Sequence, residues 1–228
     1  MKNMSPTGFV EGPHQEYAET LLGEAPSGSP DPEYGIRQLT ESIGPIAHMR
    51  QVHGDRIAYV DDSGLYEEYD ALITDIPHLW LAVKTADCVP ILISSPYAVA
   101  AIHCGWRGLQ QDLLPLTLDI LINEFETEPE DIHLTVGPHI STMNYPVSDE
   151  FTEYFPPENF IKNNGKWHLN LFSVVKDQAM EMDVISDNIW HANRCTLEDE
   201  KLNSHRRSKT NGNPDDTARN ISLIRFTR

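Results

Sequence analysis

The chain has 228 residues, of which 39% are hydrophobic and 8% aromatic, so it can bury a sizeable core and is not expected to be disordered throughout. Its formal net charge of −18 at pH 7 disfavours binding to nucleic acid or to an anionic membrane, because the mean field repels polyanions. The last 34 residues differ from the rest, since they carry seven of the 17 basic residues. This basic end is either a solvated surface segment or the part of the chain that meets an anion.

The sequence contains no run of 18 apolar residues, so no transmembrane helix is expected. Its first 17 residues lack the basic and then apolar pattern of a signal peptide. The three cysteines, Cys88, Cys104 and Cys195, are an odd number without a Cys-x-x-Cys pair, which is typical of a reducing compartment rather than a disulfide framework. These features predict a globular, cytoplasmic protein.

Short apolar runs alternate with turn signals between two predicted loops, residues 23–35 and 208–217, both of which are rich in turn-forming residues. The β-branched content and the length of the runs predict a series of strands. In chain order, they are residues 56–60, 70–74, 79–84, 89–94, 98–103, 131–136, 184–190 and 221–226.

Two helices are predicted among these strands. The first begins near Asp112, a candidate N-cap, which places Pro115 in the first turn, and it has one apolar stripe at a spacing of 3.6 residues. The stripe consists of Leu114, Leu118, Leu121, Ile122 and Phe125. The second helix is expected from Leu171 to Met182. Because the central strands are apolar on both faces, helices or a second sheet must cover them, and the expected fold is α+β, a mixed α/β arrangement in one domain spanning residues 1–228.

Three segments next to predicted strands carry reactive side chains at turns marked by glycine or proline, where side chains extend over a sheet edge. They are Gln51–Gly54, Thr85–Pro90 and His103–Gly108. Together, His53, Cys88 and His103 would offer two imidazoles and one thiolate. Such a set leaves one tetrahedral position open, as in catalytic zinc sites, and it also suits copper.

The same residues allow other interpretations. Cys88 could be a nucleophile with His103 as its base, in a hydrolase or a transferase. A histidine beside a glycine is often a turn residue, and Cys88 and Cys104 could be small buried hydrophobes. Trp106 fits the core better than a substrate platform. The residue types by themselves leave these alternatives open.

The segments also occur in an order that resembles one protein family. They are Gln-Val-His-Gly (residues 51–54), Asp-Ala-Leu-Ile-Thr (70–74), Thr-Ala-Asp-Cys-Val-Pro-Ile (85–91), His-Cys-Gly-Trp-Arg-Gly (103–108) and Gly-Pro-His-Ile (137–140). The resemblance is to the multicopper polyphenol oxidase, or laccase-domain, family, whose members are described as zinc-dependent purine nucleoside phosphorylases. Cys195-Thr196 and Ser204–Arg207 resemble C-terminal segments of that family. The resemblance covers roughly residues 47–228 and is poor over residues 1–46.

The resemblance implies a fold shared with cytotoxic necrotizing factor-type cysteine hydrolases, a layered α/β/β/α arrangement around a mixed sheet. It implies that His53, Cys88 and His103 are zinc ligands and catalytic residues, and that Cys104 only packs. The implied activity is phosphorolysis of adenosine, inosine, guanosine and methylthioadenosine, with adenosine deamination beside it. The implied partners are therefore purine nucleosides and phosphate, with Zn²⁺, or alternatively Cu²⁺, as cofactor.

Phosphorolysis needs a site for an anion, and guanidinium groups donate paired hydrogen bonds to phosphate. The candidates are Arg50, Arg107, Arg206 and Arg207. Each could instead form a structural ion pair, and Arg107 could stack on Trp106. Asp87 is either a partner that orients a ligand or a turn cap. The remaining histidines of interest, His48, His133 and His139, are interpreted as structural.

Several positions depart from the family pattern. Asn170 stands where an aspartate is usual, the segment after Arg207 is expanded, and Ala218-Arg219 replaces Gly-Arg. The stretch from Cys88 to His103 is about two residues short, which we place at the turn 94–98. If these departures remove activity, the chain is a metal-stabilised interaction protein; a second alternative is a copper-dependent phenol oxidoreductase that uses the same ligands. The chain lacks the His-x-His pairs with which multicopper oxidases hold four coppers, which disfavours the second alternative.

Overall fold

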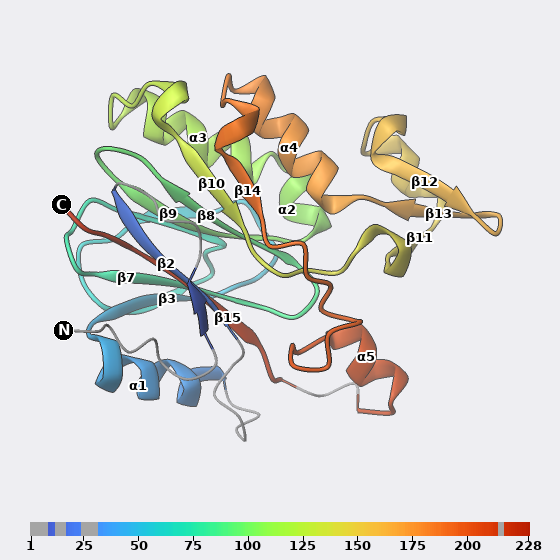
Figure 1. Ribbon diagram of the computed structural model, residues 1–228, viewed down its shortest axis with the longest axis horizontal. Helices are drawn as coiled ribbons and strands as arrows, with labels where there is room; N and C mark the ends of the chain where they lie inside the picture. Colours follow the sequence, from blue (N-terminus) through green and yellow to red (C-terminus); the bar gives the residue numbers. More distant parts are fainter. Residues whose placement is uncertain (1–8, 12–16, 24–31, 214–216) are drawn as a thin grey trace.

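A computed structural model describes residues 9–11, 17–23, 32–213 and 217–228, and Figure 1 shows their arrangement. The first six-stranded sheet has the order β1 (Phe9–Glu11), β2 (Ala18–Gly23), β15 (Asn220–Phe226), β7 (Trp80–Thr85), β3 (Ile46–Arg50) and β5 (Gly64–Glu67). The second has the order β14 (Ile189–His191), β10 (His133–Val136), β8 (Val89–Ser94), β9 (Val99–Cys104), β6 (Ala71–Thr74) and β4 (Ile57–Tyr59). Both sheets mix parallel and antiparallel pairs.

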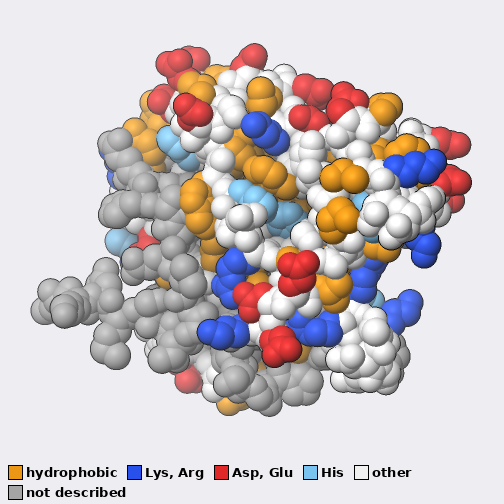
Figure 2. Space-filling view, turned by 45° about the vertical axis from the view of Figure 1, so that its right-hand side comes forward, with side chains coloured by type: hydrophobic (Ala, Val, Ile, Leu, Met, Phe, Trp, Pro, Cys, Tyr) orange, Lys and Arg blue, Asp and Glu red, His pale blue; other side chains and the backbone are white. Residues whose placement is uncertain are grey.

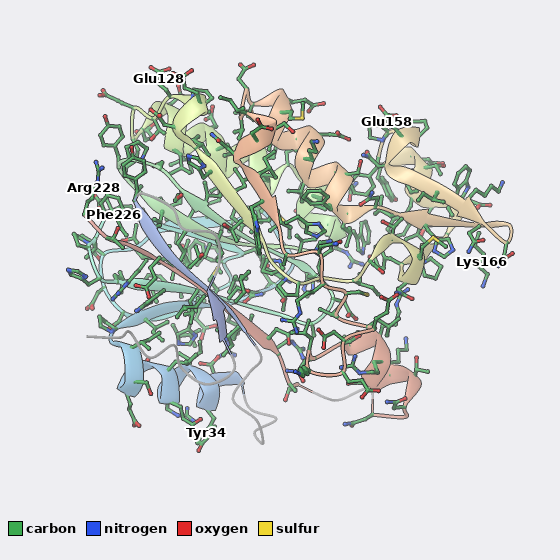
Figure 3. All side chains as sticks on the ribbon, in the orientation of Figure 1. Tyr34, Glu128, Glu158, Lys166, Phe226 and Arg228 are labelled. Carbon is green, nitrogen blue, oxygen red and sulfur yellow. The ribbon has the colours of Figure 1, made fainter. Side chains whose placement is uncertain are left out.

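The α-helices are α1 (Pro32–Ile43), α2 (Trp106–Gln110), α3 (Leu113–Asn123), α4 (Leu171–Glu181) and α5 (His205–Thr210). A third, small sheet has the order β11 (Pro146–Val147), β13 (Lys166–Leu169) and β12 (Phe160–Asn163). It extends from one side of the body, and Glu158 and Lys166 mark this extension in Figure 3. None of the helices that the structure describes has both the length and the apolar character needed to cross a bilayer.

Four layers build the body of the molecule. Leu39 of α1 packs on the outer face of the first sheet. Between the two sheets, Leu81 and Leu92 belong to one shared apolar cluster. On the outer face of the second sheet, Leu118 of α3 and Val175 of α4 complete the largest cluster. Because layers cover both faces of β8 and β9, every residue of these strands is buried, which explains their continuous apolar runs.

The structure confirms the α+β class and shows the layered order expected from the resemblance, with two mixed sheets at its centre. It also confirms all but one of the predicted strands. The exception is residues 184–190, where only the last two residues belong to β14 and residues 186–188 form a 3₁₀ turn. In that turn the Ile189 N–H bonds to the carbonyl of Ser186, so local bonding replaces ladder pairing. The sequence did not predict β1, β2, β3, β5 or the small third sheet.

Both predicted helices are present, with one correction. The stripe on α3 is buried at Leu114, Leu118 and Leu121, and α4 begins as expected at residue 171. Asp112, however, does not cap α3 with its side chain, because it is in the left-handed region (φ 57°) and accepts a hydrogen bond from Gln178 at 3.3 Å instead. Asn170 caps α4 by accepting from the Ser173 N–H at 3.1 Å, so the departure from aspartate preserves the cap.

The two predicted loops are partly helical. Residues 32–35 form the first turn of α1, and residues 208–210 end α5. Residues 24–31 and 214–216 of these loops lie outside the described residues. The polar turn-forming residues therefore mark helix ends as well as loops, because the same side chains cap helices.

Candidate metal centre

Three separate elements bring His53, Cys88 and His103 together. His53 lies in the loop after β3, Cys88 directly precedes β8, and His103 is the penultimate residue of β9. Because β8 and β9 are antiparallel, with Val89 opposite Cys104, the start of one strand meets the end of the other. One donor atom from each residue lies within 4.8 Å of the others. Among the residues that the structure describes, this is the one such group suited to a metal ion.

Asp70 holds two of the three side chains in place. It is fully buried just before β6, and its Oδ1 accepts from Nδ1 of His103 at 2.7 Å. The same carboxylate accepts from the backbone N–H of Val52, His53 and Gly54 at 3.1, 3.0 and 2.8 Å. Since Nδ1 of His103 is engaged, Nε2 is the nitrogen left for a metal. Asp70 belongs to the Asp-Ala-Leu-Ile-Thr segment identified in the sequence, but its hydrogen bonds to His103 and to the loop that carries His53 were not predicted.

The loop that carries His53 is held in an uncommon backbone conformation. His53 has φ 61°, in the left-handed region that a histidine rarely adopts. Gln51 fixes the start of the loop, because its side-chain amide bonds to both the carbonyl and the N–H of Lys84 in β7 at 2.7 and 3.0 Å. These hydrogen bonds and those to Asp70 hold the loop in one conformation. A strained backbone such as that of His53 persists at functional sites when the surrounding structure holds it in this way.

Gly105 allows the donors to approach one another. A Cβ at this position would lie 3.2 Å from Sγ of Cys88 and 3.2 Å from Cδ2 of His53. Both contacts are tighter than ordinary packing, so a larger residue would push against two donors at once. Gly105 precedes α2 and has an ordinary backbone conformation (φ −74°), so close approach rather than conformation requires glycine here.

Electrostatics favour the thiolate form of Cys88. Burial raises the pKa of this thiol, but the charge of His103 and hydrogen bonds from His103 and His53 outweigh it, bringing the pKa to about 6. Burial lowers the pKa of His103, but the Cys88 thiolate and the hydrogen bond to Asp70 raise it to about 9. A thiolate and imidazoles are the ligand types that zinc and copper prefer, so the donor set fits a metal ion of this kind.

Asp87, beside Cys88, ties the C-terminal segment to the site. Its carboxylate accepts from Oγ1 of Thr196 at 2.6 Å and from the N–H of Arg206 in the first turn of α5 at 2.8 Å. Its backbone is in the left-handed region (φ 90°). Of the two roles that the sequence allowed, the structure supports the cap, here across a chain separation of 119 residues.

The paired arginines of α5 have different surroundings. Arg206 lies over the ring of Tyr145, 5.0 Å from its centroid, and donates to the carbonyl of Asn144 at 2.9 Å. Arg207 donates to four backbone carbonyls, those of Thr196, Leu197, Asp199 and Leu202. The Arg207 guanidinium is therefore occupied by carbonyls of the chain itself, whereas one hydrogen bond of the Arg206 side chain, to Asn144, lies within the described residues.

The other two arginine candidates lie at the surface. Arg50 forms an ion pair with Glu67 at 2.7 Å and its side chain is 65% exposed, as the structural interpretation expected. Arg107 stacks on Trp106 with its guanidinium 4.3 Å from the ring centroid, also as expected. Trp106 itself is half-buried against the largest apolar cluster. Arg50 is thus not grouped with the donors by any contact within the described residues.

The residues interpreted as structural have structural contacts. His48 faces Glu33 of α1 at 3.5 Å, and buried His139 bonds through Nδ1 to the carbonyl of Gly137 at 2.9 Å. His133 is half-buried at the start of β10. Cys104 is fully buried, and burial raises the pKa of its thiol. None of them belongs to the donor group.

The charge distribution over the surface is uneven. Figure 2 shows Asp and Glu side chains along the upper edge of one face, whereas Lys and Arg side chains lie mostly in its lower half. That half is the side on which α5 lies in Figure 1. The basic end noted in the sequence therefore lies on the side where most of the visible Lys and Arg side chains gather, with Asp and Glu side chains among them.

The fold and the site define an α+β protein with two packed mixed sheets and a His/Cys/His donor group at their edge. The chain belongs to the family described as "Multi-copper polyphenol oxidoreductase laccase", which it matches over residues 35–227. It is 35% identical over 161 residues to a purine nucleoside phosphorylase of Aquifex aeolicus, covering 70% of this chain and 75% of that protein. It is 32% identical over 192 residues to one from Haemophilus influenzae, covering 76% and 75%.

Solved structures share the fold. YlmD from Geobacillus stearothermophilus superimposes with a TM-score of 0.86 at 24% identity, covering 99% of this chain and 98% of that one. The Bacillus licheniformis hypothetical protein YfiH gives a TM-score of 0.82 at 22% identity, with coverages of 92% and 93%. At these identities the likeness concerns the fold.

Proposed function

We propose that this protein is a zinc-dependent purine nucleoside phosphorylase whose ligands are His53, Cys88 and His103. The observation that carries the proposal is the convergence of these donors on one point, with Asp70 orienting His103. The names of relatives at 32–35% identity supply the reaction class. The substrates are adenosine, inosine, guanosine and methylthioadenosine, and adenosine deamination accompanies phosphorolysis.

Zinc fits this donor set better than the coppers of a multicopper oxidase. Within the described part of the chain, one group of three donors is present, whereas such oxidases need many histidines to hold four metal ions. Three ligands with an open fourth position are the pattern of catalytic zinc. Zinc at this position supplies Lewis-acid polarisation of a substrate or water atom.

The residues around the donors suit the anionic co-substrate. Phosphorolysis breaks the bond between the purine and the anomeric carbon while a phosphate oxygen bonds to that carbon, and the purine leaves with a proton. Arg206 is the residue we propose to hold the phosphate, and the hydrogen bond from its backbone N–H to Asp87, next to Cys88, supports this assignment. Arg107 is a second guanidinium near this side, and both exert an electrostatic influence on Tyr145.

The deciding experiment uses zinc-loaded protein and adenosine with and without phosphate. Phosphate-dependent release of free adenine supports phosphorolysis, and inosine supports deamination. Oxidation of a phenol by protein purified with copper, without any turnover of nucleosides, would overturn the proposal in favour of the oxidoreductase. Absence of any turnover in the metal-loaded protein would favour the interaction protein instead.

Two broader points belong to the same proposal. The cysteines form no disulfide, which suits activity in the cytoplasm. The layered architecture is the one we propose to be shared with cytotoxic necrotizing factor-type hydrolases, and a comparison of the donor edge in the two folds would test that relationship.

A further inference from the structure

Tyr145, which the sequence analysis did not single out, is close enough to Cys88 for the two side chains to interact electrostatically. It follows the 3₁₀ turn Thr142–Asn144, and its carbonyl accepts from the Leu169 N–H at 3.2 Å, which fixes the backbone. Its ring packs half-buried against the largest apolar cluster, and the guanidinium of Arg206 lies 5.0 Å from the ring centroid. The ring is therefore held on both sides, by the core and by Arg206.

The hydroxyl of Tyr145 is not engaged by any of the described residues. Among the residues that the structure describes, no group makes a hydrogen bond to it, and it is not among the buried polar atoms that lack a partner. A tyrosine with a partly buried ring normally finds a partner for its hydroxyl, in the protein or in solvent. This hydroxyl is thus available to solvent or to a ligand at the edge of the site.

Four charged side chains influence the phenol of Tyr145 electrostatically. Burial is the largest influence on the pKa of Tyr145, and the Cys88 thiolate is the strongest of the charges, followed by Arg206, Asp87 and Arg107. Together they raise the pKa to about 12. A phenol with the ordinary tyrosine pKa of about 10 is already protonated at physiological pH, so the Tyr145 hydroxyl is a neutral O–H donor next to the Arg206 guanidinium.

We propose that the Tyr145 hydroxyl donates a hydrogen bond to the phosphate co-substrate held by Arg206, and so acts as a substrate-positioning residue. The inference rests on the proposed phosphorolysis. The Arg206 guanidinium lies over the Tyr145 ring and uses one N–H on the Asn144 carbonyl, so its other N–H groups can bind an anion next to this phenol. The Tyr145 hydroxyl would add one directed hydrogen bond to the phosphate dianion beside those from Arg206. Such a bond is strong because its acceptor oxygen is charged.

The test compares zinc-loaded wild-type protein with Tyr145→Phe, which keeps the ring and its contact with Arg206. The matched control is Tyr97→Phe, at an exposed tyrosine (56%) in the turn between β8 and β9, at the far end of the hairpin from Cys88. Binding of inorganic phosphate is measured by calorimetry, and KM is measured separately for phosphate and for adenosine. Thermal unfolding of each variant checks that the fold is intact.

We expect Tyr145→Phe to weaken phosphate binding roughly tenfold and to raise the KM for phosphate by a similar factor, as for loss of one hydrogen bond to a charged group. The KM for adenosine and the Tm should stay close to wild type, and Tyr97→Phe should change nothing. Equal phosphate binding by wild type and Tyr145→Phe would overturn the inference, as would a wild type that binds no phosphate. Phosphate binding that depends on Tyr145 without phosphate-dependent release of adenine would support the contact and contradict the proposed function.

Discussion

Asp70 shows how one buried carboxylate can organise a site made of distant residues. Burial raises the pKa of this carboxyl, but the hydrogen bond from His103 and those from the N–H groups of Gly54 and Val52 outweigh it, so the pKa is lowered. The carboxylate thus stays charged and fully hydrogen-bonded although it is 0% exposed. Its bonds connect the loop after β3 to the end of β9, and they set the orientation of two metal-type donors.

Replacing Asp70 with asparagine should weaken zinc binding by roughly 10- to 100-fold, the loss typical when a group that orients a metal-bound histidine is changed. An amide cannot accept all four hydrogen bonds, and it carries no charge for His103. Competition with a chelator measures the zinc affinity. Asp75→Asn is the control, since Asp75 lies at the other end of β6 and accepts from the Tyr59 hydroxyl. Unchanged affinity in Asp70→Asn would show that the donors are held without this carboxylate.

His191 should make the protein sensitive to acid. Its ring stacks on Phe172 at 4.1 Å, and its buried Nε2 has no hydrogen-bond partner among the described residues. Burial and, next, the charge of His139 lower the pKa of His191 from 6.5 to about 4. Between these two values the unfolded chain binds a proton that the folded protein does not, so the free energy of unfolding falls as pH decreases from 6.5 towards 4.

His191→Phe keeps an aromatic ring against Phe172 and removes the titration. Urea unfolding at several pH values should therefore show a shallower loss of stability between pH 6.5 and 4 than in wild type. His78→Asn, at an exposed histidine, should leave the wild-type slope unchanged. If the slope of His191→Phe equals that of wild type, another group controls the acid sensitivity.

At the scale of elements, the site depends on where neighbouring strands begin and end. Cys88 and His103 come together because the start of β8 pairs with the end of β9, and a single residue separates the end of β9 from the start of α2. The connecting residue, Gly105, packs against two donors. The connection between the end of β9 and the start of α2 therefore needs glycine, because any side chain here would contact Cys88 and His53.

Gly105→Ala should weaken zinc binding roughly tenfold, as for other changes that displace metal ligands, because its Cβ would crowd Cys88 and His53. The matched variant is Gly108→Ala in α2, where the nearest atoms lie at an ordinary 3.5 Å and alanine favours the helix by about 1 kcal/mol. Zinc affinity and thermal unfolding are measured for both. Equal zinc affinity of the two variants would mean that the donors adjust to the added methyl group.

In the whole molecule, the C-terminal segment connects the two large sheets to the site. Asp87 binds Thr196 and Arg206, and further along, Asn203 and Asn220 exchange hydrogen bonds of 2.7 and 2.8 Å at the start of β15. The segment thus runs from the edge of the second sheet to the centre of the first. Within this segment, the guanidinium of Arg207 donates hydrogen bonds to backbone carbonyls and so holds the segment together.

Arg207→Met should reduce the free energy of unfolding by roughly 1–3 kcal/mol, because several half-buried carbonyls lose a charged donor. Arg206→Met should instead leave stability near wild type and raise the KM for phosphate more than that for nucleoside. Urea unfolding and steady-state kinetics separate the two effects. If Arg207→Met were as stable as wild type and had a raised KM for phosphate, Arg207 would be a phosphate-binding residue and this prediction would be wrong.

Features that depend on a local pattern of residues were predictable before the fold was known. Continuous apolar runs identified β8 and β9 because both faces of these strands are buried, and the spacing of 3.6 residues identified α3. The metal-type donors were also recognisable, since few residue types bind zinc and each stood at a marked turn. At Asp112 the sequence pattern predicted the helix that follows, but it did not predict that the Asp112 side chain would accept a hydrogen bond from Gln178 instead of capping that helix.

The residues that support the site became apparent from the three-dimensional contacts. Asp70 lies 33 residues from His103, and Asp87 lies 119 residues from Arg206, so no local pattern relates them. Arg206 and Arg207 could not be told apart from the sequence either, because they are adjacent residues of the same type. One faces Tyr145 and the other faces carbonyls because successive residues of a helix point in different directions, and the packing of α5 selects which direction meets the site.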